Sequence, residues 1–391
     1  MDGFEYAPDE VRKVVAENLD KSTKLVTTSL AIISKIDEYM SSQEPSSMVD
    51  EIEKSSELTS DSEPTWLSSK YWKLVKERRI KVNAVVAEDG SGDYETITEA
   101  IKAVPARSKN RFVIYVKEGL YRENVNVAKD KWNVLMYGDG MDKTIVSGNR
   151  SNSLGITTTM TATFAVHGKR FIARDMGFHN TAGAGGGQAV ALLSSADQSV
   201  FHRCLFDSYQ DTLFTQSKRQ FYRECKIYGT MDFIFGDAAV VIQNSEILVK
   251  KSPSQKTAVI TAQGKDIPYS KTGISIQKCT IMPAENLRGV KTYLGRPWKN
   301  YSTTVIMESH LGSFIDPKGW LPWNKGVGAP DTISYIEYKN VGPGASTAER
   351  VTWKGLSVND TQSDAGKFTV RSFIDGDNWL PSTGVPYQAD L

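Results

Sequence analysis

The chain has 391 residues, which is long enough to bury a sizeable core and to hold one large domain with a smaller addition. Its 47 basic and 46 acidic residues nearly cancel, so net charge indicates neither nucleic acid nor an anionic membrane as a partner. No apolar run approaches the roughly 20 residues that a membrane-spanning helix needs. Three cysteines without a C-x-x-C pair argue against a zinc site or a disulfide scaffold, and they allow at most one internal bridge.

The first 80 residues predict a helix followed by a linker. Apolar residues recur at roughly helical spacing over residues 8–40, with charged residues between them, which predicts one amphipathic helix. Residues 41–65 are rich in Ser and Glu, and the stretch to residue 80 ends in a basic run that includes Arg78 and Arg79. We interpret this stretch as a flexible linker whose basic end is either a solvated hinge or a processing site.

From residue 81 onward, short β-rich segments alternate with Gly, Asn and Asp, after one helix expected over residues 96–104. Similar strand pieces then recur, and each has a small residue two positions before an apolar one. These small residues stand at steps of 21, 20, 34 and 30 and are Cys204, Cys225, Ser245, Cys279 and Ser309. A strand ladder with a period near 20 and variable insertions is typical of a solenoid.

The absence of helices between these strands favours a parallel β-helix over a leucine-rich repeat. A β-sandwich is the alternative, but it would show regular hairpin turns, and from residue 81 onward only three Asp-Gly signals occur, at Asp89, Asp139 and Asp375. We therefore predict an all-β parallel β-helix (solenoid), with one N-terminal amphipathic helix outside it.

Two aspartates, Asp211 and Asp232, are also 21 residues apart, the same offset as Cys204 and Cys225. This shared offset predicts that equivalent positions stack on successive coils. Parallel strands lie about 4.8 Å apart, so the two carboxylates are expected to lie close together. Like charges at that distance cannot both ionise cheaply, and one pKa should rise. A protonated carboxyl group beside an ionised one can serve as proton donor and nucleophile, the pair of groups that a hydrolase needs.

Neighbouring coils supply further polar groups. Gln188 and Gln210 differ by 22 residues, again about one coil, and their amides are candidate donors to an oxyanion. Arg296 is the candidate cation that holds one aspartate ionised. Each has a plainer alternative: an aspartate often caps a turn, glutamines form structural ladders, and an arginine makes surface ion pairs. Their convergence on adjacent coils among aromatic residues favours a site.

Other chemistries find little support in the sequence. No Gly-x-Ser-x-Gly elbow occurs, and none of the four histidines has a triad context. The glycine-rich segment at residues 183–187 lacks the Lys-Ser/Thr of a phosphate loop. No His-Glu-x-x-His zinc motif or calcium-loop motif is present either.

Six segments carry a resemblance to the plant-type pectin methylesterase (pectinesterase) family, over about Val82 to Leu391. They are Asp89–Tyr94, Gly119–Val125, the segments around Gln188, Tyr209 and Asp232, and Leu294–Trp298. The resemblance implies a right-handed parallel β-helix over residues 81–391. It also implies hydrolysis of the methyl esters of galacturonate in pectin, which releases methanol without a metal or cofactor.

The resemblance also implies residue roles. Asp232 corresponds to the nucleophile, Asp211 to the acid/base and Gln210 to the stabiliser of the transition state. The positions that resemble substrate contacts are Thr158, Gln188, Arg296 and Trp298, and Arg296 also steers Asp232. Trp320 and Trp323 are weaker candidates for stacking on sugar rings, with packing as the equal alternative.

Residues 1–40 resemble the last helix of an inhibitor-like pro-region and are interpreted as a remnant of it. The implied partners are pectin and, as a candidate, a proteinaceous pectinesterase inhibitor. The protein is expected to be a monomer that binds neither nucleic acid nor a membrane. The implied location is secreted, in the cell wall, although residues 1–5 lack the pattern of a signal peptide. Sequons at Asn149, Asn300 and Asn359 are compatible with that location but weak.

The chain departs from the family pattern at several positions. Thr159 stands where many relatives carry Phe, residues 185–187 are all glycine, and Ser245 replaces a common Cys. Phe214, Met231 and Asp237 are further departures. Two other functions therefore stay open: a different β-helix pectin enzyme, glycosidase or lyase, and a non-catalytic wall-binding protein.

Overall fold

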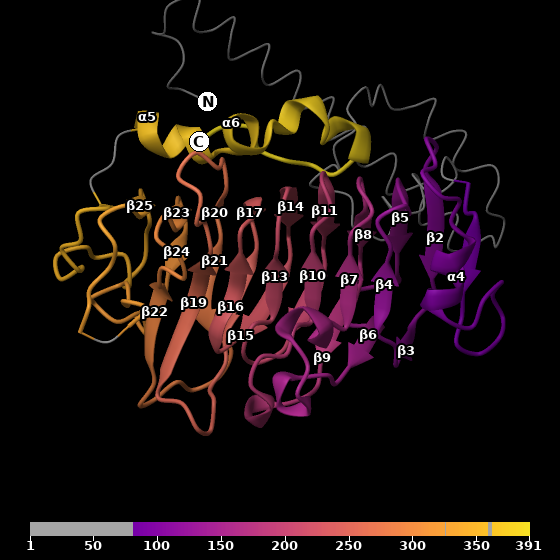
Figure 1. Ribbon diagram of the computed structural model, residues 1–391, viewed down its shortest axis with the longest axis horizontal. Coiled ribbons are helices and arrows are strands. Elements are labelled where there is room, and N and C mark those ends of the chain that lie inside the picture. The colour runs from indigo at the N-terminus through magenta and orange to yellow at the C-terminus, as the bar shows by residue number, and fades with distance from the viewer. Residues whose placement is uncertain (1–80, 325, 359–361) are drawn as a thin grey trace, which may run out of the picture. The chain divides into compact units, whose positions relative to one another are not determined.

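Three parallel sheets wind along the computed structural model, which describes residues 81–324, 326–358 and 362–391 (Figure 1). Every strand pair in the described residues is parallel, and from β3 (Gly119–Tyr121) to β25 (Ser334–Tyr338) each strand lies in a different sheet from the strand before it. The predicted parallel β-helix is confirmed. The amphipathic helix predicted over residues 8–40 and the linker over 41–80 lie outside the described residues.

The strands of each sheet are named here with their bounds. Sheet A contains β1 (Ala84–Val86), β2 (Phe112–Val116), β5 (Val134–Tyr137), β8 (Ile172–Arg174), β11 (Ser199–His202), β14 (Arg219–Arg223), β17 (Ala239–Gln243), β20 (Gly273–Gln277), β23 (Thr303–Met307), β25 (Ser334–Tyr338) and β26 (Leu356–Ser357). Sheet B contains β3 (Gly119–Tyr121), β6 (Thr144–Gly148), β9 (Gly177–Asn180), β12 (Leu205–Asp207), β15 (Lys226–Gly229), β18 (Glu246–Val249), β21 (Thr280–Pro283) and β24 (His310–Leu311). Sheet C contains β4 (Val125–Val127), β7 (Phe164–Val166), β10 (Leu192–Ser194), β13 (Leu213–Thr215), β16 (Met231–Gly236), β19 (Thr257–Gln263) and β22 (Lys291–Gly295).

The predicted column of small residues occupies the turn between sheets A and B. Cys225 N donates to Ser245 Oγ at 3.0 Å, and Cys279 N donates to Ser309 Oγ at 3.0 Å, so the column is linked from coil to coil. The residue before each small residue has a positive φ; these residues are Arg203, Glu224, Asn244, Lys278 and Glu308. A small side chain fits inside this sharp turn, which explains the repeat. The three cysteines are buried and free.

Aromatic side chains stack along the interior of the coils. Phe201 and Tyr222 stack with ring centroids 4.8 Å apart, and Phe178 and Phe206 stack at 5.6 Å. These side chains come from strands that pair in register, so each coil places its aromatic ring against the ring of the next coil. Their burial is a main source of the hydrophobic stabilisation of the solenoid.

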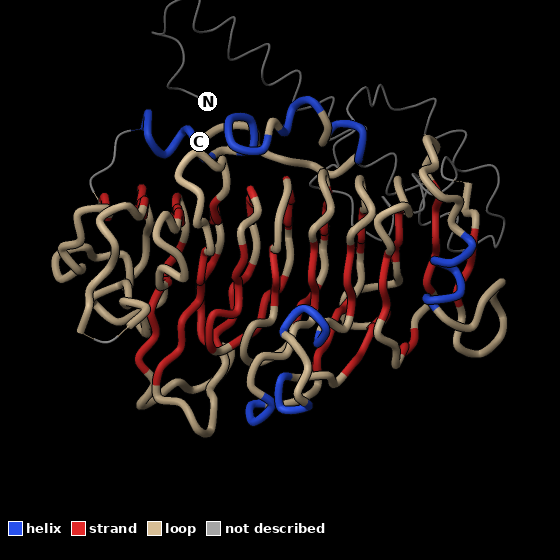
Figure 2. The backbone as a smooth tube through the Cα atoms, viewed as in Figure 1, coloured by secondary structure: helices blue, strands red, loops and turns tan. Residues whose placement is uncertain are grey.

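Short helices cap and flank the coils (Figure 2). The predicted helix at residues 96–104 is confirmed as α4 (Ile97–Ala103), whose N-cap Thr96 accepts a hydrogen bond from Glu99 N. The remaining helices are α5 (Gln362–Ala365), α6 (Val370–Ile374) and the 3-10 turns η1 (Asn152–Leu154), η2 (Thr158–Thr161), η3 (Ala184–Gly186), η4 (Gly366–Phe368), η5 (Gly376–Asn378) and η6 (Pro381–Thr383).

The C-terminal segment lies across the outside of sheet A. Ser275 Oγ donates to Phe368 O at 2.8 Å, and Gln243 and Gln388 exchange two hydrogen bonds. This segment covers sheet A, whereas the outer side of sheet C carries the pocket described next.

Candidate active site

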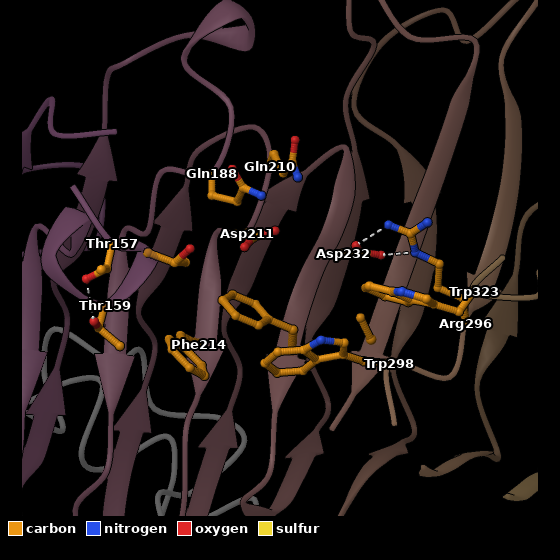
Figure 3. Close-up of a pocket in the computed structure, with 13 residues that line it drawn as sticks. Thr157, Thr159, Gln188, Gln210, Asp211, Phe214, Asp232, Arg296, Trp298 and Trp323 are labelled. Atoms are coloured by element: carbon orange, nitrogen blue, oxygen red, sulfur yellow. Dashed lines mark hydrogen bonds and ion pairs between the residues drawn. The ribbon is translucent and has the colours of Figure 1, made fainter. Parts of the chain in front are cut away.

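One pocket of about 420 Å³ lies on the outer face of sheet C and contains all seven predicted site residues (Figure 3). Its lining consists of Thr157, Thr158, Thr159, Gln188, Gln210, Asp211, Phe214, Asp232, Phe235, Ala262, Arg296, Trp298 and Trp323. The predicted stacking of coils therefore brings together residues that are up to 140 positions apart in the chain.

The backbone is unusual at both aspartates. Asp211 has a φ of 64° and Asp232 a φ of 50°, so both adopt the left-handed conformation that non-glycine residues rarely occupy. Aspartate tolerates this conformation better than most residues. Asp211 N donates to Met231 O at 3.1 Å, so the two left-handed positions lie on adjacent coils.

Asp232 also lies at a β-bulge. The pairing of β16 with β19 shifts between Met231 and Ile234, and two residues there oppose one residue of β19. Phe233 enters the core with no exposed surface, while Asp232 lines the pocket. The bulge therefore turns the aspartate out of a strand whose neighbours are buried.

Arg296 holds the Asp232 carboxylate with two hydrogen bonds. Nε donates to Oδ1 at 2.8 Å, and Nη2 donates to Oδ2 at 2.5 Å. The guanidinium carbon also lies 4.2 Å from the ring centroid of Trp323. This fork geometry fixes the orientation of the carboxylate and favours its ionised form.

The two aspartates differ in proton affinity. Burial raises the pKa of Asp211 well above its usual range, and the nearby charge of Asp232 raises this pKa further. Burial also raises the pKa of Asp232, but the hydrogen bonds and charge of Arg296 oppose that rise. Asp211 is thus the member of the pair that keeps its proton, and Asp232 is the member that ionises first.

The two glutamines lie beside Asp211. Gln188 and Gln210 pair as a parallel bridge on adjacent coils, and the hydrogen bond from the Gln210 side chain partly offsets the rise in the Asp211 pKa. Figure 3 shows both amides on the Asp211 side of the pocket. The sequence reasoning missed Asn152, whose Nδ2 donates to Gln188 Oε1 at 2.9 Å.

Aromatic rings form the apolar floor of the pocket. Phe214 and Phe235 stack at 4.3 Å, and the Trp298 ring lies edge-on to Phe235 at 6.2 Å. Trp298 is 36% exposed, so one part of its indole surface is open to a ligand. An apolar floor with a few convergent polar groups is typical of a small-molecule binding site.

The two weaker tryptophan candidates separate. Trp323 lines the pocket and is 37% exposed, in line with the sequence interpretation. Trp320 is only 1% exposed, and its Nε1 donates to Glu337 Oε1 at 3.0 Å inside the solenoid. The stacking role considered for Trp320 is therefore wrong, because its ring is a core side chain packed against Tyr335.

Two further observations concern ions and membranes. Among the described residues, no group of three or more His, Cys, Asp or Glu side chains is arranged to hold a metal ion. No helix in the described part of the chain has the length and apolar character needed to cross a membrane.

The fold and the site together define a parallel β-helix protein with paired aspartates in an aromatic-lined pocket. Within that class, the chain belongs to the pectinesterase family, because the family model described as Pectinesterase matches residues 83–377. The resemblance stated from the sequence is confirmed.

Individual relatives support the same assignment. The chain is 57% identical over 311 residues to "Probable pectinesterase/pectinesterase inhibitor 46" of Arabidopsis thaliana, covering 80% of this chain and 55% of the relative. It is 47% identical over 395 residues to "Pectinesterase/pectinesterase inhibitor PPE8B" of Prunus persica, covering 100% of this chain and 72% of the relative. The chain therefore spans little more than half the length of the first of these relatives.

A solved structure has the same fold. The pectin methylesterase from carrot superposes with a TM-score of 0.78 at 48% sequence identity, covering 80% of this chain and 99% of the carrot chain.

Proposed function

We propose that this chain hydrolyses the methyl esters of galacturonate in pectin. The observation that carries the proposal is the pair formed by Asp232, held by Arg296, and the proton-retaining Asp211 in one aromatic-lined pocket. The substrate class is supported by membership of the pectinesterase family and by the names of the relatives.

In the first half-reaction, an Asp232 carboxylate oxygen attacks the ester carbonyl carbon and forms a new C–O bond. The side-chain amides of Gln188 and Gln210 donate to the oxyanion of the tetrahedral intermediate. The bond to the methoxy oxygen then breaks, and Asp211 transfers its proton to that oxygen, which leaves as methanol. The product is an anhydride between Asp232 and the galacturonate carbonyl.

In the second half-reaction, a water molecule attacks the anhydride at the galacturonate carbonyl. Asp211, now ionised, removes a proton from that water. The bond to Asp232 breaks, galacturonate is released as a carboxylic acid that gives its remaining proton to solvent, and both aspartates return to their starting states. The net change is one ester and one water converted to one acid and one methanol.

The walls of the pocket are proposed to hold the polymer. Trp298 and Trp323 offer exposed indole surface for sugar rings, and Thr158 also lines the pocket. We further propose that residues 1–40 are a remnant of an inhibitor-like pro-region, that residues 41–80 are a linker and that residues 81–391 are the catalytic region. The proposed setting is the plant cell wall, where a monomeric enzyme meets pectin and, as a candidate partner, a protein inhibitor.

Product analysis on highly methylated pectin tests the proposal. We expect the chain to release methanol while the length of the polymer, measured by viscosity and size-exclusion chromatography, stays unchanged. Shortened polymer would indicate a glycosidase or lyase, and binding to pectin without methanol would indicate a non-catalytic protein. Either result would overturn the proposed function.

A further inference from the structure

In the loop at residues 151–155, Asn152 makes two hydrogen bonds to Gln188. The Asn152 backbone N–H donates to Gln188 O at 3.0 Å, and the Asn152 side-chain Nδ2 donates to Gln188 Oε1 at 2.9 Å. The same Nδ2 lies 3.5 Å from Thr158 Oγ1. Thus one half-buried side chain contacts both Gln188 and Thr158.

The direction of the hydrogen bond from Asn152 Nδ2 to Gln188 Oε1 determines which end of the Gln188 amide faces the pocket. A glutamine amide has one oxygen that only accepts hydrogen bonds and one NH2 group that only donates them. Because Asn152 occupies the oxygen of Gln188, the NH2 group is left for the other side. Figure 3 shows the Gln188 nitrogen directed toward Gln210 and Asp211.

The opposite amide orientation would be unsuitable for the proposed chemistry. It would direct the Gln188 oxygen at the place where the oxyanion develops. A hydrogen bond from the NH2 group to the oxyanion would then be replaced by repulsion between two oxygens that carry negative charge. A free glutamine side chain can adopt both orientations, so a fixed neighbour is needed to select one.

We propose that Asn152 is a positioning residue that holds the Gln188 amide with its NH2 group facing the oxyanion. This inference rests on the proposed function and assigns a role to a side chain that does not line the pocket. Asn152 makes no contact with the reacting atoms; it acts through Gln188. The contact joins residues 36 positions apart, from the η1 turn and from the segment that follows η3.

The test compares the kinetics of methanol release by the full chain with those of two Asn152 variants. We expect Asn152→Ala to lower kcat about tenfold with little change in KM. Removing a single oxyanion donor lowers kcat by about 100-fold or more, and in this variant the Gln188 NH2 group is misaligned rather than removed. Asn152→Asp is nearly the same shape, but its carboxylate only accepts hydrogen bonds. It should attract the Gln188 NH2 group away from the pocket and lower kcat further.

A double-mutant cycle separates positioning from a general structural role. This cycle adds Gln188→Ala and the double variant; in the Gln188→Ala background, Asn152→Ala should lower kcat by less than about twofold, because the group it positions is already absent. The matched control is Asn110→Ala, an exposed asparagine in a loop between α4 and β2, which should leave kcat unchanged. Thermal unfolding of each variant checks that the fold is retained.

Three outcomes would overturn the inference. The first is an Asn152→Asp variant with wild-type kcat, and this variant decides the matter even where Asn152→Ala does not fold. The second is an equal loss of kcat from Asn152→Ala with and without Gln188. The third is a rise in KM with kcat unchanged. A wild-type chain that releases no methanol would overturn the proposed function itself, which is a separate and recognisable result.

Discussion

At the residue scale, Asp211 and Asp232 illustrate how two identical side chains acquire different properties from their neighbours. Asp232 has Arg296 as a bidentate partner, whereas Asp211 has a glutamine amide and the nearby charge of Asp232. Both are largely buried, so the partner decides which one ionises. The same contrast predicts how each aspartate affects stability and pH dependence.

Replacing Asp211 should stabilise the protein at neutral pH. Its pKa is raised in the folded state, so folding favours the protonated form. The resulting cost is absent below the pKa of the unfolded chain, grows as the pH rises toward the folded-state pKa and is complete above it. We therefore expect Asp211→Asn, which removes a buried charge and keeps the shape of the side chain, to raise the free energy of unfolding at pH 7.

Denaturant unfolding at pH 7 and at pH 3 measures this difference, and the gain should disappear at the lower pH. Asp232→Asn is the matched control, because it leaves the Arg296 guanidinium without its partner and should give no gain. An Asp211→Asn variant that is equally stable or less stable at pH 7 would contradict the proposed proton affinity.

Arg296 should determine the acidic limit of activity. Its hydrogen bonds and charge lower the pKa of Asp232, and Asp232 must be ionised to attack. In Arg296→Gln this pKa rises, so the acidic limb of the profile of kcat/KM against pH should move up by about one pH unit or more. Arg296→Lys keeps the charge without the fork and should give a smaller displacement. An acidic limb that stays in place in Arg296→Gln would contradict the assignment.

At the element scale, the site depends on what happens where strands end or break. Asp232 lies in a bulge of β16, and Trp298 follows β22 and packs beside Gly264, which follows β19. A Cβ atom on Gly264 would lie 2.6 Å from Trp298 Cε3, so the absence of a side chain at Gly264 lets the indole lie against the sheet.

Gly264→Ala should therefore displace the Trp298 ring and weaken substrate binding. We expect KM for methylated pectin to rise by about threefold to tenfold with kcat nearly unchanged, as for a loss of binding shared by ground state and transition state. Gly185→Ala is the matched control, because no atom lies within 4 Å of a Cβ at that position. Equal KM values for the two variants would show that the Trp298 ring does not contact the substrate.

The sequence predicted the elements that repeat, together with helix α4, and it missed the bulge at Asp232 and the contact made by Asn152. The column of small residues that begins with Cys204 and Cys225 could be recognised in the sequence because each coil repeats the same turn. In that turn, a residue with positive φ, such as Arg203 or Glu224, precedes the small residue. The bulge at Asp232 left no repeating signal. Asn152 lies in an insertion outside the repeat, and thus its contact with Gln188 could be found only from the folded chain.

Trp320 and Trp323 show a second limit of sequence reasoning. They are three residues apart and chemically identical, yet one is a core residue and the other lines the pocket. The segment that contains them lies outside the regular strands, so no periodicity indicates which side each ring faces.

At the scale of the whole molecule, stability and site geometry share one origin, the register of the coils. Sheet C presents Phe214 and Phe235 outward to the pocket, while Phe201 and Tyr222 stack inside. A coil that slipped by one residue would turn every side chain to the opposite face. The interior aromatic rings therefore help to maintain the alignment on which the site depends.

Phe201 is the interior ring whose loss should be most informative. It is fully buried and lies within 6.5 Å of four other aromatic rings. Phe201→Ala should lower the free energy of unfolding by about 3–5 kcal/mol in urea titrations, because it leaves a cavity between coils. Tyr269→Ala, at an 86% exposed ring, should change it by no more than about 0.5 kcal/mol. Similar small effects in both variants would contradict a core built from stacked rings.

The most direct test of the account is the rate of methanol release from methylated pectin by Asp232→Asn, with its fold checked by thermal unfolding. An amide cannot replace the carboxylate as a nucleophile, so we expect kcat to fall by about 10⁴-fold or more in a folded protein. A folded Asp232→Asn variant that releases methanol at a rate near that of the wild type would contradict the central claim.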